Sequence, residues 1–289
     1  MDLCNLSVIK SVMADAGITF RKEFGQNFLI NRIIPEEIAE QCADDKESMI
    51  LEIGPGIGCL TAELASRYSK VVAVEIDKGL IPVLDKTLAE FDNVTVINAD
   101  VMKIDLVALI AEHSEGRPVS VCANLPYYIT TPILMMLLES GIKFSTITVM
   151  VQNEVAQRLV AEPGKADYGA ITAMLGYYGT VRRLFKVSAG SFVPAPKVDS
   201  AVIRIDLYRE PKFEPKSEKL FKSLVKASFE MRRKTLQNAI SAKLQGYSKE
   251  DIKSAIVAIG HSETVRGECL STEDFVKLSD KLYELRYEI

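Results

Sequence analysis

The stretch MILEIGPGIG, residues 49–58, joins a short apolar run to three glycines placed at every second position. The run at 49–53 is typical of a buried strand. Glycine lets the backbone turn sharply and lets a ligand approach without a Cβ in the way. A helical pattern follows from Leu60 to Tyr68. This stretch therefore predicts a strand, a ligand-binding loop and a helix in succession.

Beyond this unit, apolar runs alternate with helical patterns. The predicted strands are residues 71–76, 93–99, 119–123 and 145–151, and the predicted helices are 79–90, 105–112, 132–140 and a stretch from Gln152. Helix 132–140 is expected to have Thr131 as its N-cap. Two β-rich runs, near 180–187 and at 201–207, are expected to close one edge of the sheet. The alternation predicts an α/β fold with helices on both faces of a mostly parallel sheet.

The pattern changes after Tyr208. Residues 210–216 form a charged segment that contains two prolines, which is typical of a linker. From Ser217 onward the apolar residues recur at helical spacing. We therefore expect a first domain of residues 1–209. A small all-helical domain of residues 210–289 is expected to follow.

Composition limits the class of protein. The chain has 289 residues, 48% of them hydrophobic, but no apolar run approaches the ~18 residues of a membrane span. Residues 1–17 lack the apolar core of a signal peptide. The five cysteines form no CxxC pair and are expected to be reduced and buried, and the two histidines lie too far apart for a structural zinc site. These features predict a cytoplasmic protein without a metal, and a monomer is the default expectation.

The charge is distributed unevenly along the chain. The net charge is −4, yet residues 216–243 contain eight Lys and Arg against two Glu, a local charge of +6. A basic face on an acidic protein is typical of a nucleic-acid contact. A solvated helix face explains the same charges equally well, so charge alone leaves both interpretations open.

Acidic residues follow the ends of the second and third predicted strands. The second strand ends in Glu75-Ile76-Asp77, where an acid about 20 residues past the glycines is placed to accept both hydroxyls of a ribose. Asp100, after the third strand, offers a carboxylate to an adenine amino group. The glycines and the acid after the second strand fit a dinucleotide and S-adenosylmethionine equally. The GxGxG spacing, which differs from the GxGxxG of dinucleotide-binding proteins, favours S-adenosylmethionine. Asp77 is interpreted instead as an acid at a helix N-terminus.

The loop NLPY, residues 124–127, ends the fourth predicted strand and suits an adenine amine. The lone pair of that amine is delocalised into the ring, so methyl transfer requires acceptors that hold its two hydrogens. The Asn124 side-chain oxygen and the Leu125 carbonyl oxygen are the candidates. Pro126 fixes the loop, and Tyr127 offers a flat face for a flipped-out base, worth ~1–3 kcal/mol. Catalysis of this kind rests mainly on positioning.

Four motifs stand together in this chain: FGQNFL (24–29), EIGPG (52–56), NLPY (124–127) and FVPAPKVDS (192–200). With RRKTL at 232–236, they resemble the KsgA/RsmA family of small-subunit rRNA dimethyladenosine transferases. The resemblance implies a class I S-adenosylmethionine-dependent methyltransferase with a Rossmann-like seven-stranded sheet. It implies that residues 1–209 are the catalytic domain, in which 1–30 supplies a helix and a loop facing cofactor and RNA. It also implies a helical C-terminal domain that binds RNA or the ribosome. The implied reaction is dimethylation of two adjacent adenosines near the 3′ end of 16S rRNA, in the immature small subunit during late assembly.

The resemblance also implies roles for individual residues. The cofactor-binding set would be Gln26, Asn27, Leu29, Gly54, Gly56, Glu75, Ile76, Asp100, Val101 and Asn124, and the catalytic set would be Asn124, Leu125, Pro126, Tyr127 and Phe192. Tyr127 and Phe192 would sandwich the target base. From the local pattern alone, a lone Phe192 before two prolines is more typical of a core residue.

Contacts to RNA are expected from two basic segments. They comprise Arg21, Lys22, Arg232, Arg233 and Lys234. The segment 232–234 is expected on a helix whose apolar stripe faces elsewhere. There it would bind phosphates and position the protein without reading sequence.

Several other functions fit part of the pattern. Erythromycin-resistance methylases, which modify an adenine of 23S rRNA, are similar in fold and in the glycine and NLPY motifs. A DNA adenine methyltransferase shares the chemistry but usually has a different motif and an additional target-recognition insert. An assembly factor whose binding role outweighs methylation, and a dinucleotide oxidoreductase, remain the alternatives from other classes.

Overall fold

The computed structural model describes residues 1–18 and 26–287. The chain divides into two compact units, one of Met1–Ala156 with Arg182–Arg209 and one of Gln157–Val181 with Glu210–Ile289. The break at 209/210 is where the change of sequence pattern lies. Residues 157–181, which the sequence pattern grouped with the sheet, belong by their contacts to the second unit.

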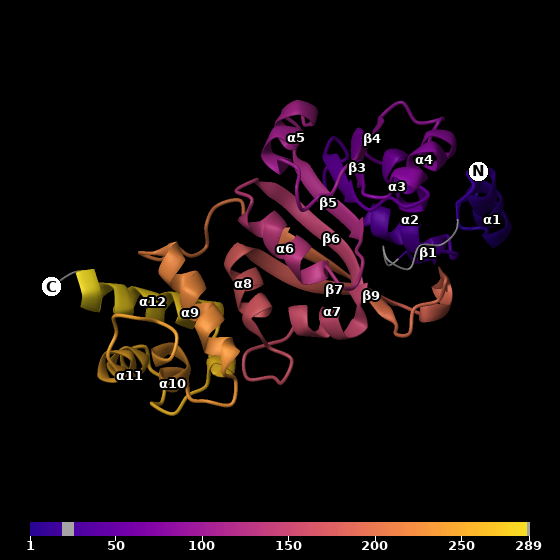
Figure 1. The fold of residues 1–289 in the computed structure, drawn as a ribbon. Helices are drawn as coiled ribbons and strands as arrows, with labels where there is room; N and C mark the ends of the chain where they lie inside the picture. Colours follow the sequence, from indigo (N-terminus) through magenta and orange to yellow (C-terminus); the bar gives the residue numbers. More distant parts are fainter. Residues whose placement is uncertain (19–25, 288–289) are drawn as a thin grey trace. The chain divides into compact units, whose positions relative to one another are not determined.

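The first unit is built on a seven-stranded sheet in the order β4-β3-β2-β5-β6-β9-β7 (Figure 1). Neighbours from β4 to β6 pair in parallel, whereas β9 pairs antiparallel with β6. This confirms the predicted mostly parallel sheet of a class I methyltransferase fold. The strands are β2 (Met49–Ile53), β3 (Lys70–Glu75), β4 (Val94–Asn98), β5 (Val119–Asn124), β6 (Phe144–Gln152), β7 (Gly179–Val187) and β9 (Ser200–Leu207).

Helices follow the strands as the alternating pattern predicts. They are α1 (Leu6–Asp15), α2 (Ile33–Glu40), α3 (Cys59–Ala65), η2 (Lys78–Leu80), α4 (Ile81–Thr87), α5 (Leu106–His113), α6 (Thr130–Glu139) and α7 (Asn153–Leu159), followed later in the chain by the short η3 (Ala189–Ser191). Every residue of β2 is buried, as expected for a central strand covered on both faces. One face packs against α2 and α3, where Ile38 and Leu64 lie in a cluster with Ile50 and Met150.

The predicted start of helix 132–140 was wrong by two residues. The helix α6 begins at Thr130 rather than Pro132, and its N-cap is Ile129, whose side chain makes no capping hydrogen bond. The Thr130 hydroxyl donates instead to the Pro126 carbonyl oxygen at 3.2 Å. The helix therefore begins directly from the loop that carries the NLPY motif.

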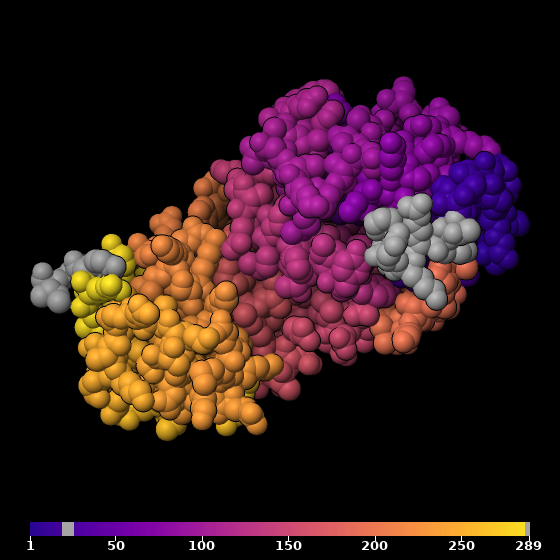
Figure 2. Space-filling model, in the orientation of Figure 1, coloured from indigo at the N-terminus to yellow at the C-terminus, as the bar shows by residue number. Residues whose placement is uncertain are grey.

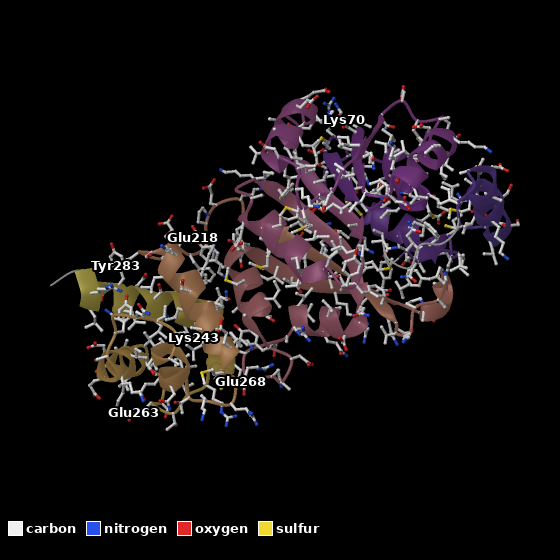
Figure 3. The ribbon with its side chains drawn as sticks, in the orientation of Figure 1. Lys70, Glu218, Lys243, Glu263, Glu268 and Tyr283 are labelled. Carbon is white, nitrogen blue, oxygen red and sulfur yellow. The ribbon has the colours of Figure 1, made fainter. Side chains whose placement is uncertain are left out.

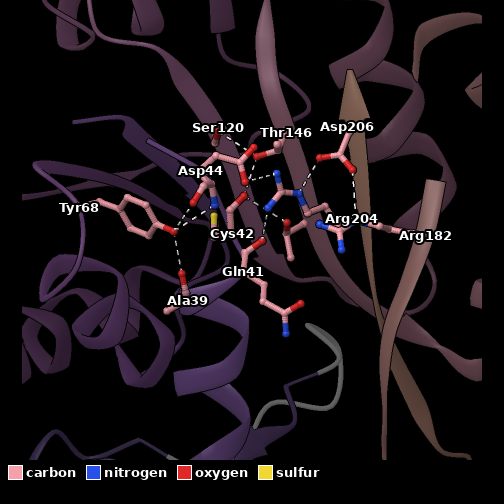
Figure 4. Close-up of polar contacts among 12 residues, drawn as sticks. Ala39, Gln41, Cys42, Asp44, Tyr68, Ser120, Thr146, Arg182, Arg204 and Asp206 are labelled. Atoms are coloured by element: carbon pink, nitrogen blue, oxygen red, sulfur yellow. Dashed lines mark hydrogen bonds and ion pairs between the residues drawn. The ribbon is translucent and has the colours of Figure 1, made fainter. Parts of the chain in front are cut away.

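A buried arginine anchors β9 to the turn that follows α2 (Figure 4). The Arg204 side chain is 4% exposed and forms ion pairs with Asp44 and Asp206, both at 2.7 Å. It also donates to the Gln41 carbonyl oxygen at 2.9 Å. Because a buried guanidinium is tolerated only when its donors are satisfied, this network holds β9 firmly in the sheet. It is a structural feature that the sequence pattern did not reveal.

A second, two-stranded sheet joins distant motifs in the first unit. The strand β1 (Phe28–Leu29) comes from the FGQNFL motif and β8 (Phe192–Val193) from the FVPAPKVDS motif. They pair antiparallel, with Phe28 opposite Val193 and Leu29 opposite Phe192. The pairing fixes the N-terminal segment beside the main sheet.

The second unit is mainly helical around an aromatic core, and its part from residue 210 onward is coloured orange to yellow in Figure 2. Its helices are α8 (Ala170–Tyr178), α9 (Glu218–Glu230), α10 (Leu236–Ser241), α11 (Lys249–Ala258), η4 (Gly267–Cys269) and α12 (Thr272–Tyr287). Tyr177 of α8 stacks on Phe221 of α9 with ring centroids 4.8 Å apart, and Tyr168 lies 5.8 Å from Phe229. These aromatic contacts explain why residues 157–181 belong to this unit.

Within residues 1–18 and 26–287, no helix is long and apolar enough to cross a membrane, and no cluster of His, Cys, Asp or Glu could hold a metal ion. All five cysteines are free. Cys269 is exposed and Cys59 is half-buried, so the expectation that all five are buried was wrong for these two residues.

Candidate active site

A cavity lies at the carboxyl ends of β2, β3 and β5, the edge at which open α/β sheets bind ligands. It brings together the N-terminal segment 26–29, the glycine loop 54–57, the end of β3 and the loop 124–127. The predicted site residues that line it are Gln26, Asn27, Leu29, Gly54, Gly56, Glu75, Ile76, Asn124, Leu125, Pro126 and Tyr127. Segments nearly 100 residues apart in sequence thus share one wall.

The glycine loop runs close to the N-terminal segment. Gly56 has a φ of +62°, in the left-handed region that glycine adopts without steric cost. A Cβ at this position would lie 3.0 Å from the Phe28 ring. Both the turn and the close approach therefore require glycine at position 56.

Glu75, the last residue of β3, is buried beside this loop. Its Oε2 accepts a hydrogen bond from the Gly56 backbone N–H at 3.1 Å, and its Oε1 accepts one from the Asp77 N–H at 2.8 Å. Burial raises the pKa of Glu75, and the two backbone N–H groups oppose that shift. Each oxygen keeps acceptor capacity, which suits the hydroxyls of a ribose.

Asp77 caps the 3₁₀ turn η2, as its interpretation as a helix N-terminal acid predicts. Its Oδ1 accepts from the Gly79 N–H at 3.0 Å. Its Oδ2 accepts from the Gln26 side-chain amide at 2.9 Å. Gln26 therefore lines the cavity and ties the N-terminal segment to the end of β3.

Glu52 lines the cavity, although no sequence argument gave it a role. It lies within β2 at 1% exposure, and its Oε2 has no hydrogen-bond partner among the described residues. Burial raises the pKa of its carboxyl to about 8. A buried carboxyl oxygen without a partner is costly, so it suits a donor or cationic group placed in the cavity. A lone acid inside an apolar strand was the sequence signal that could have identified it.

Asn124 ends β5 with its side chain at the cavity. Its Nδ2 lies 3.4 Å from the Asn27 carbonyl oxygen, which leaves Oδ1 available as an acceptor. The Leu125 N–H donates to the Met150 carbonyl oxygen of β6 at 3.3 Å. The first two residues of the NLPY motif are thereby held against β6 and the N-terminal segment.

The remaining residues of the motif are also anchored. The Pro126 carbonyl oxygen accepts from the Ile129 N–H and the Thr130 hydroxyl, both at 3.2 Å. The Tyr127 hydroxyl hydrogen-bonds to Ser200 Oγ at 2.7 Å. Burial raises the pKa of Tyr127, so its hydroxyl is protonated over the physiological pH range.

Phe192 does not line the cavity. Its side chain is 3% exposed and packs in a core cluster with Leu29, Ile38 and Val202. The structure agrees with the core interpretation of the local pattern. The face for a target base that the resemblance implied is absent at Phe192 in this conformation, because other side chains cover the ring.

Asp100 and Val101 lie outside the residues that line the cavity. Asp100 follows β4, and its carboxylate accepts from the Met102 N–H at 3.0 Å and forms an ion pair with Lys103 at 3.2 Å. The Ala99 N–H donates to the Glu75 carbonyl oxygen at 3.0 Å, so the end of β4 lies beside the end of β3. The expected contact of Asp100 with an adenine stays a prediction.

The segment Arg232–Lys234 does not lie on a helix, so that expectation was wrong. It forms the turn between α9 and α10. Arg232 donates to the carbonyl oxygens of Ala166 and Tyr168 at 2.8 and 3.0 Å and forms an ion pair with Glu268. Figure 3 labels Glu268 in the helical unit. These contacts of Arg232 all lie within the second unit.

Of the other cations of the basic segment, Lys222 is half-buried and the rest are exposed. Lys216, Lys222 and Lys243 form ion pairs with acids, and Lys243 binds Glu230 at 2.6 Å. The exposed cations without an ion-pair partner among the described residues are Lys219, Lys226, Arg233 and Lys234. Arg21 and Lys22, the other predicted RNA contacts, lie outside the described residues.

Comparison with known proteins identifies close relatives of this chain. Residues 17–282 match the model of the ribosomal RNA adenine dimethylase family. "Ribosomal RNA small subunit methyltransferase A" from Alkaliphilus metalliredigens is 45% identical over 276 residues, covering 96% of each chain. The protein of the same name from Streptococcus gordonii is 45% identical over 286 residues, covering 98% of each chain.

Solved structures share the fold. The 23S rRNA methyltransferase ErmE is 28% identical with a TM-score of 0.69, covering 89% of this chain and all of that chain. A dimethyladenosine transferase from Plasmodium falciparum is 24% identical with a TM-score of 0.72, covering 86% and 95% of the two chains, and supports the fold alone. The family match over nearly the whole chain agrees with the four motifs and with the cavity that three of them line. This chain therefore belongs to the ribosomal RNA adenine dimethylase family.

Proposed function

We propose that this protein is an S-adenosylmethionine-dependent methyltransferase that dimethylates the N6 amines of two adjacent adenosines near the 3′ end of 16S rRNA. The observation that carries the proposal is the position of the NLPY loop. Asn124 and Tyr127 line the same cavity as Glu75 and the glycine loop. A site that holds a nucleoside cofactor therefore adjoins a site that suits an adenine amine.

The residues of the cavity fit the cofactor. Glu75 is held by two backbone N–H groups and suits a ribose diol, and Gly56 places no side chain between the loop and a ligand. The Oε2 of Glu52, unpartnered among the described residues, suits the positive charge of the methionine part. When bound, S-adenosylmethionine supplies a methyl group on a sulfonium, a strong electrophile.

The loop 124–127 provides what the nucleophile needs. Asn124 Oδ1 and the Leu125 carbonyl oxygen accept the two hydrogens of the adenine amine, which turns the nitrogen lone pair out of the ring plane. Tyr127, which lines the cavity, supplies the stacking face. After transfer, the methylated nitrogen is acidic and loses its proton to water, so no strong base is required. Preorganised acceptors and orientation account for the catalysis.

Binding to RNA is proposed for the second unit. Lys219 and Lys226 lie seven residues apart on α9, and Arg233 and Lys234 follow in the turn. Exposed cations of this kind bind phosphates and position a protein without reading the bases. The proposed partner is 16S rRNA within the immature small subunit, during late assembly. A cytoplasmic location, a monomeric state and activity without a metal complete the proposal.

The alternative substrate is 23S rRNA, the substrate named for ErmE. The relatives named for the small subunit are 45% identical to this chain over nearly its whole length, against 28% for ErmE. This difference supports the small subunit.

The test incubates purified small and large subunits that lack adenine methylation with the protein and methyl-labelled S-adenosylmethionine. Label confined to the small subunit supports the proposal. Label in the large subunit assigns the protein to the resistance type. Tight binding to the small subunit without label leaves an assembly factor.

A further inference from the structure

Two adjacent tyrosines of the NLPY loop have different surroundings. Tyr127 lines the cavity, and its hydroxyl hydrogen-bonds to Ser200 Oγ at 2.7 Å. The next residue, Tyr128, is 67% exposed. The backbone of this loop therefore permits a solvent-facing tyrosine. The contact with Ser200 is a specific reason for Tyr127 to stay at the wall.

Ser200 is itself rigidly placed. It is the first residue of β9, is fully buried, and lies opposite Gln152 in the antiparallel pairing of β6 with β9. The buried Arg204 network anchors the same strand four residues further on. The hydroxyl that holds Tyr127 thus belongs to the main sheet rather than to a loop.

The strand β6 pairs both with β9, which carries Ser200, and with β5, which ends at the amine acceptor Asn124. Asn124 lies opposite Met150 in the parallel pairing of β5 with β6, and the Leu125 N–H bonds to the Met150 carbonyl oxygen. Ser200 lies opposite Gln152, two residues further along the same strand. The amine acceptors are therefore held on β6 by the Leu125 N–H. The Tyr127 ring is held on the same strand indirectly, through Ser200 of β9.

We propose that Ser200 is a positioning residue for methyl transfer, whose hydroxyl fixes the Tyr127 ring as the stacking face for the target adenine. This inference rests on the proposed function. The adenine amine can reach Asn124 Oδ1 and the Leu125 carbonyl oxygen together only when the base plane is set. A stacked base takes its plane from the ring beneath it, so the ring must not rotate.

Loss of the hydrogen bond is expected to act on turnover rather than on binding. The ring would still be present and would still stack, but it would sample rotamers that turn the amine away from its acceptors. The affinity for the subunit, which depends largely on phosphate contacts, would hardly change. A net hydrogen bond corresponds to about a tenfold change in rate.

The test compares Ser200→Ala, Tyr127→Phe and the double variant in methylation of undermethylated small subunits. Each single variant is expected to lower kcat about tenfold. The KM for the subunit and the dissociation constant for S-adenosylmethionine should stay within about twofold of wild type. Because both substitutions remove the same bond, the double variant should be no slower than either single variant. Ser200→Thr, which keeps the hydroxyl, should restore most of the rate.

A matched control separates positioning from stability. Thr146 lies on β6, is buried, and does not line the cavity. Its hydroxyl donates to the Cys42 carbonyl oxygen at 2.6 Å. Thr146→Val should lower Tm without lowering kcat when assayed well below that Tm. Single variants at Ser200 and Tyr127 that keep wild-type kcat, or whose losses simply add in the double variant, would overturn the inference. Wild-type protein that labels no subunit would instead refute the proposed function.

Discussion

The cavity of the first unit and the basic turn of the second are both assigned to RNA, yet their construction is opposite. At the cavity, Glu75, Asn124 and Tyr127 are each held by hydrogen bonds to other parts of the unit. In the turn, Arg233 and Lys234 are exposed and have no ion-pair partner among the described residues. Fixed groups suit chemistry on one atom, whereas exposed cations suit a polyanion whose phosphates they need not meet at set positions.

The largest loss of activity is expected when the proposed amine acceptor, Asn124, is removed. Asn124→Ala should lower kcat about 10²–10³-fold, the cost of removing one preorganised group at a reacting centre. Single-turnover methylation of small subunits measures this. The matched control is Asn153→Ala, because Asn153 binds Arg183 at 2.9 Å and does not line the cavity. Equal rates for Asn124→Ala and wild type would show that the amine is not held at this loop.

The next largest effect is expected at the cofactor. Glu75→Gln replaces a charged acceptor and should weaken S-adenosylmethionine binding about 10–100-fold, as loss of charged hydrogen bonds does. Isothermal titration calorimetry with S-adenosylhomocysteine measures the change without turnover. Glu36→Gln, which removes only an exposed ion pair with Arg32, should bind normally. Unchanged affinity in Glu75→Gln would place the cofactor elsewhere.

Glu52 predicts a pH dependence of stability in the protein without cofactor. Its pKa is raised to about 8 from a usual 4.5, so the folded state binds this proton more tightly than the unfolded state. The stabilisation that this tighter proton binding gives the folded state is fully present below pH 4.5 and is lost as the pH rises toward 8. The free energy of unfolding of wild type, relative to Glu52→Gln, should fall by about 1.4 kcal/mol per pH unit between pH 5 and 8. Parallel profiles in urea titrations would contradict a protonated Glu52.

The smallest effects distinguish two neighbouring arginines. Arg233→Ala should lower the salt slope of RNA binding by roughly one unit per lost phosphate contact and leave Tm unchanged. Arg232→Ala should lower stability by about 1–2 kcal/mol through its lost hydrogen bonds and leave the salt slope nearly unchanged. Filter binding across a salt series and thermal unfolding measure both. The reverse pattern would show that Arg232, rather than Arg233, contacts RNA.

The sequence predicted those features that local pattern determines. Apolar runs located all seven strands of the main sheet, and the residues at their ends indicated Asn124 and an acid within residues 75–77. The pattern did not predict that Tyr177 and Phe221 would join residues 157–181 to the helical unit, because such contacts depend on tertiary packing. The burial of Phe192 followed from its local pattern but not from the family resemblance.

The links between motifs were also beyond the sequence. Ser200 ends a motif that was recognised, but its bond to Tyr127 spans 73 residues and depends on the register of β9. Arg232 was predicted to bind phosphate because the sequence shows its positive charge but not its contacts. Its acceptors, the carbonyl oxygens of Ala166 and Tyr168, are backbone atoms that no side-chain pattern reveals.

Identification of the product tests the central claim most directly. Small subunits lacking dimethyladenosine would be incubated with wild type or Asn124→Ala and labelled S-adenosylmethionine, and their rRNA digested for mass spectrometry. The account predicts N6,N6-dimethyladenosine at two adjacent positions near the 3′ end with wild type and almost none with Asn124→Ala. Label on a ribose or another ring atom, or equal dimethyladenosine with Asn124→Ala, would contradict an active site built on the NLPY loop.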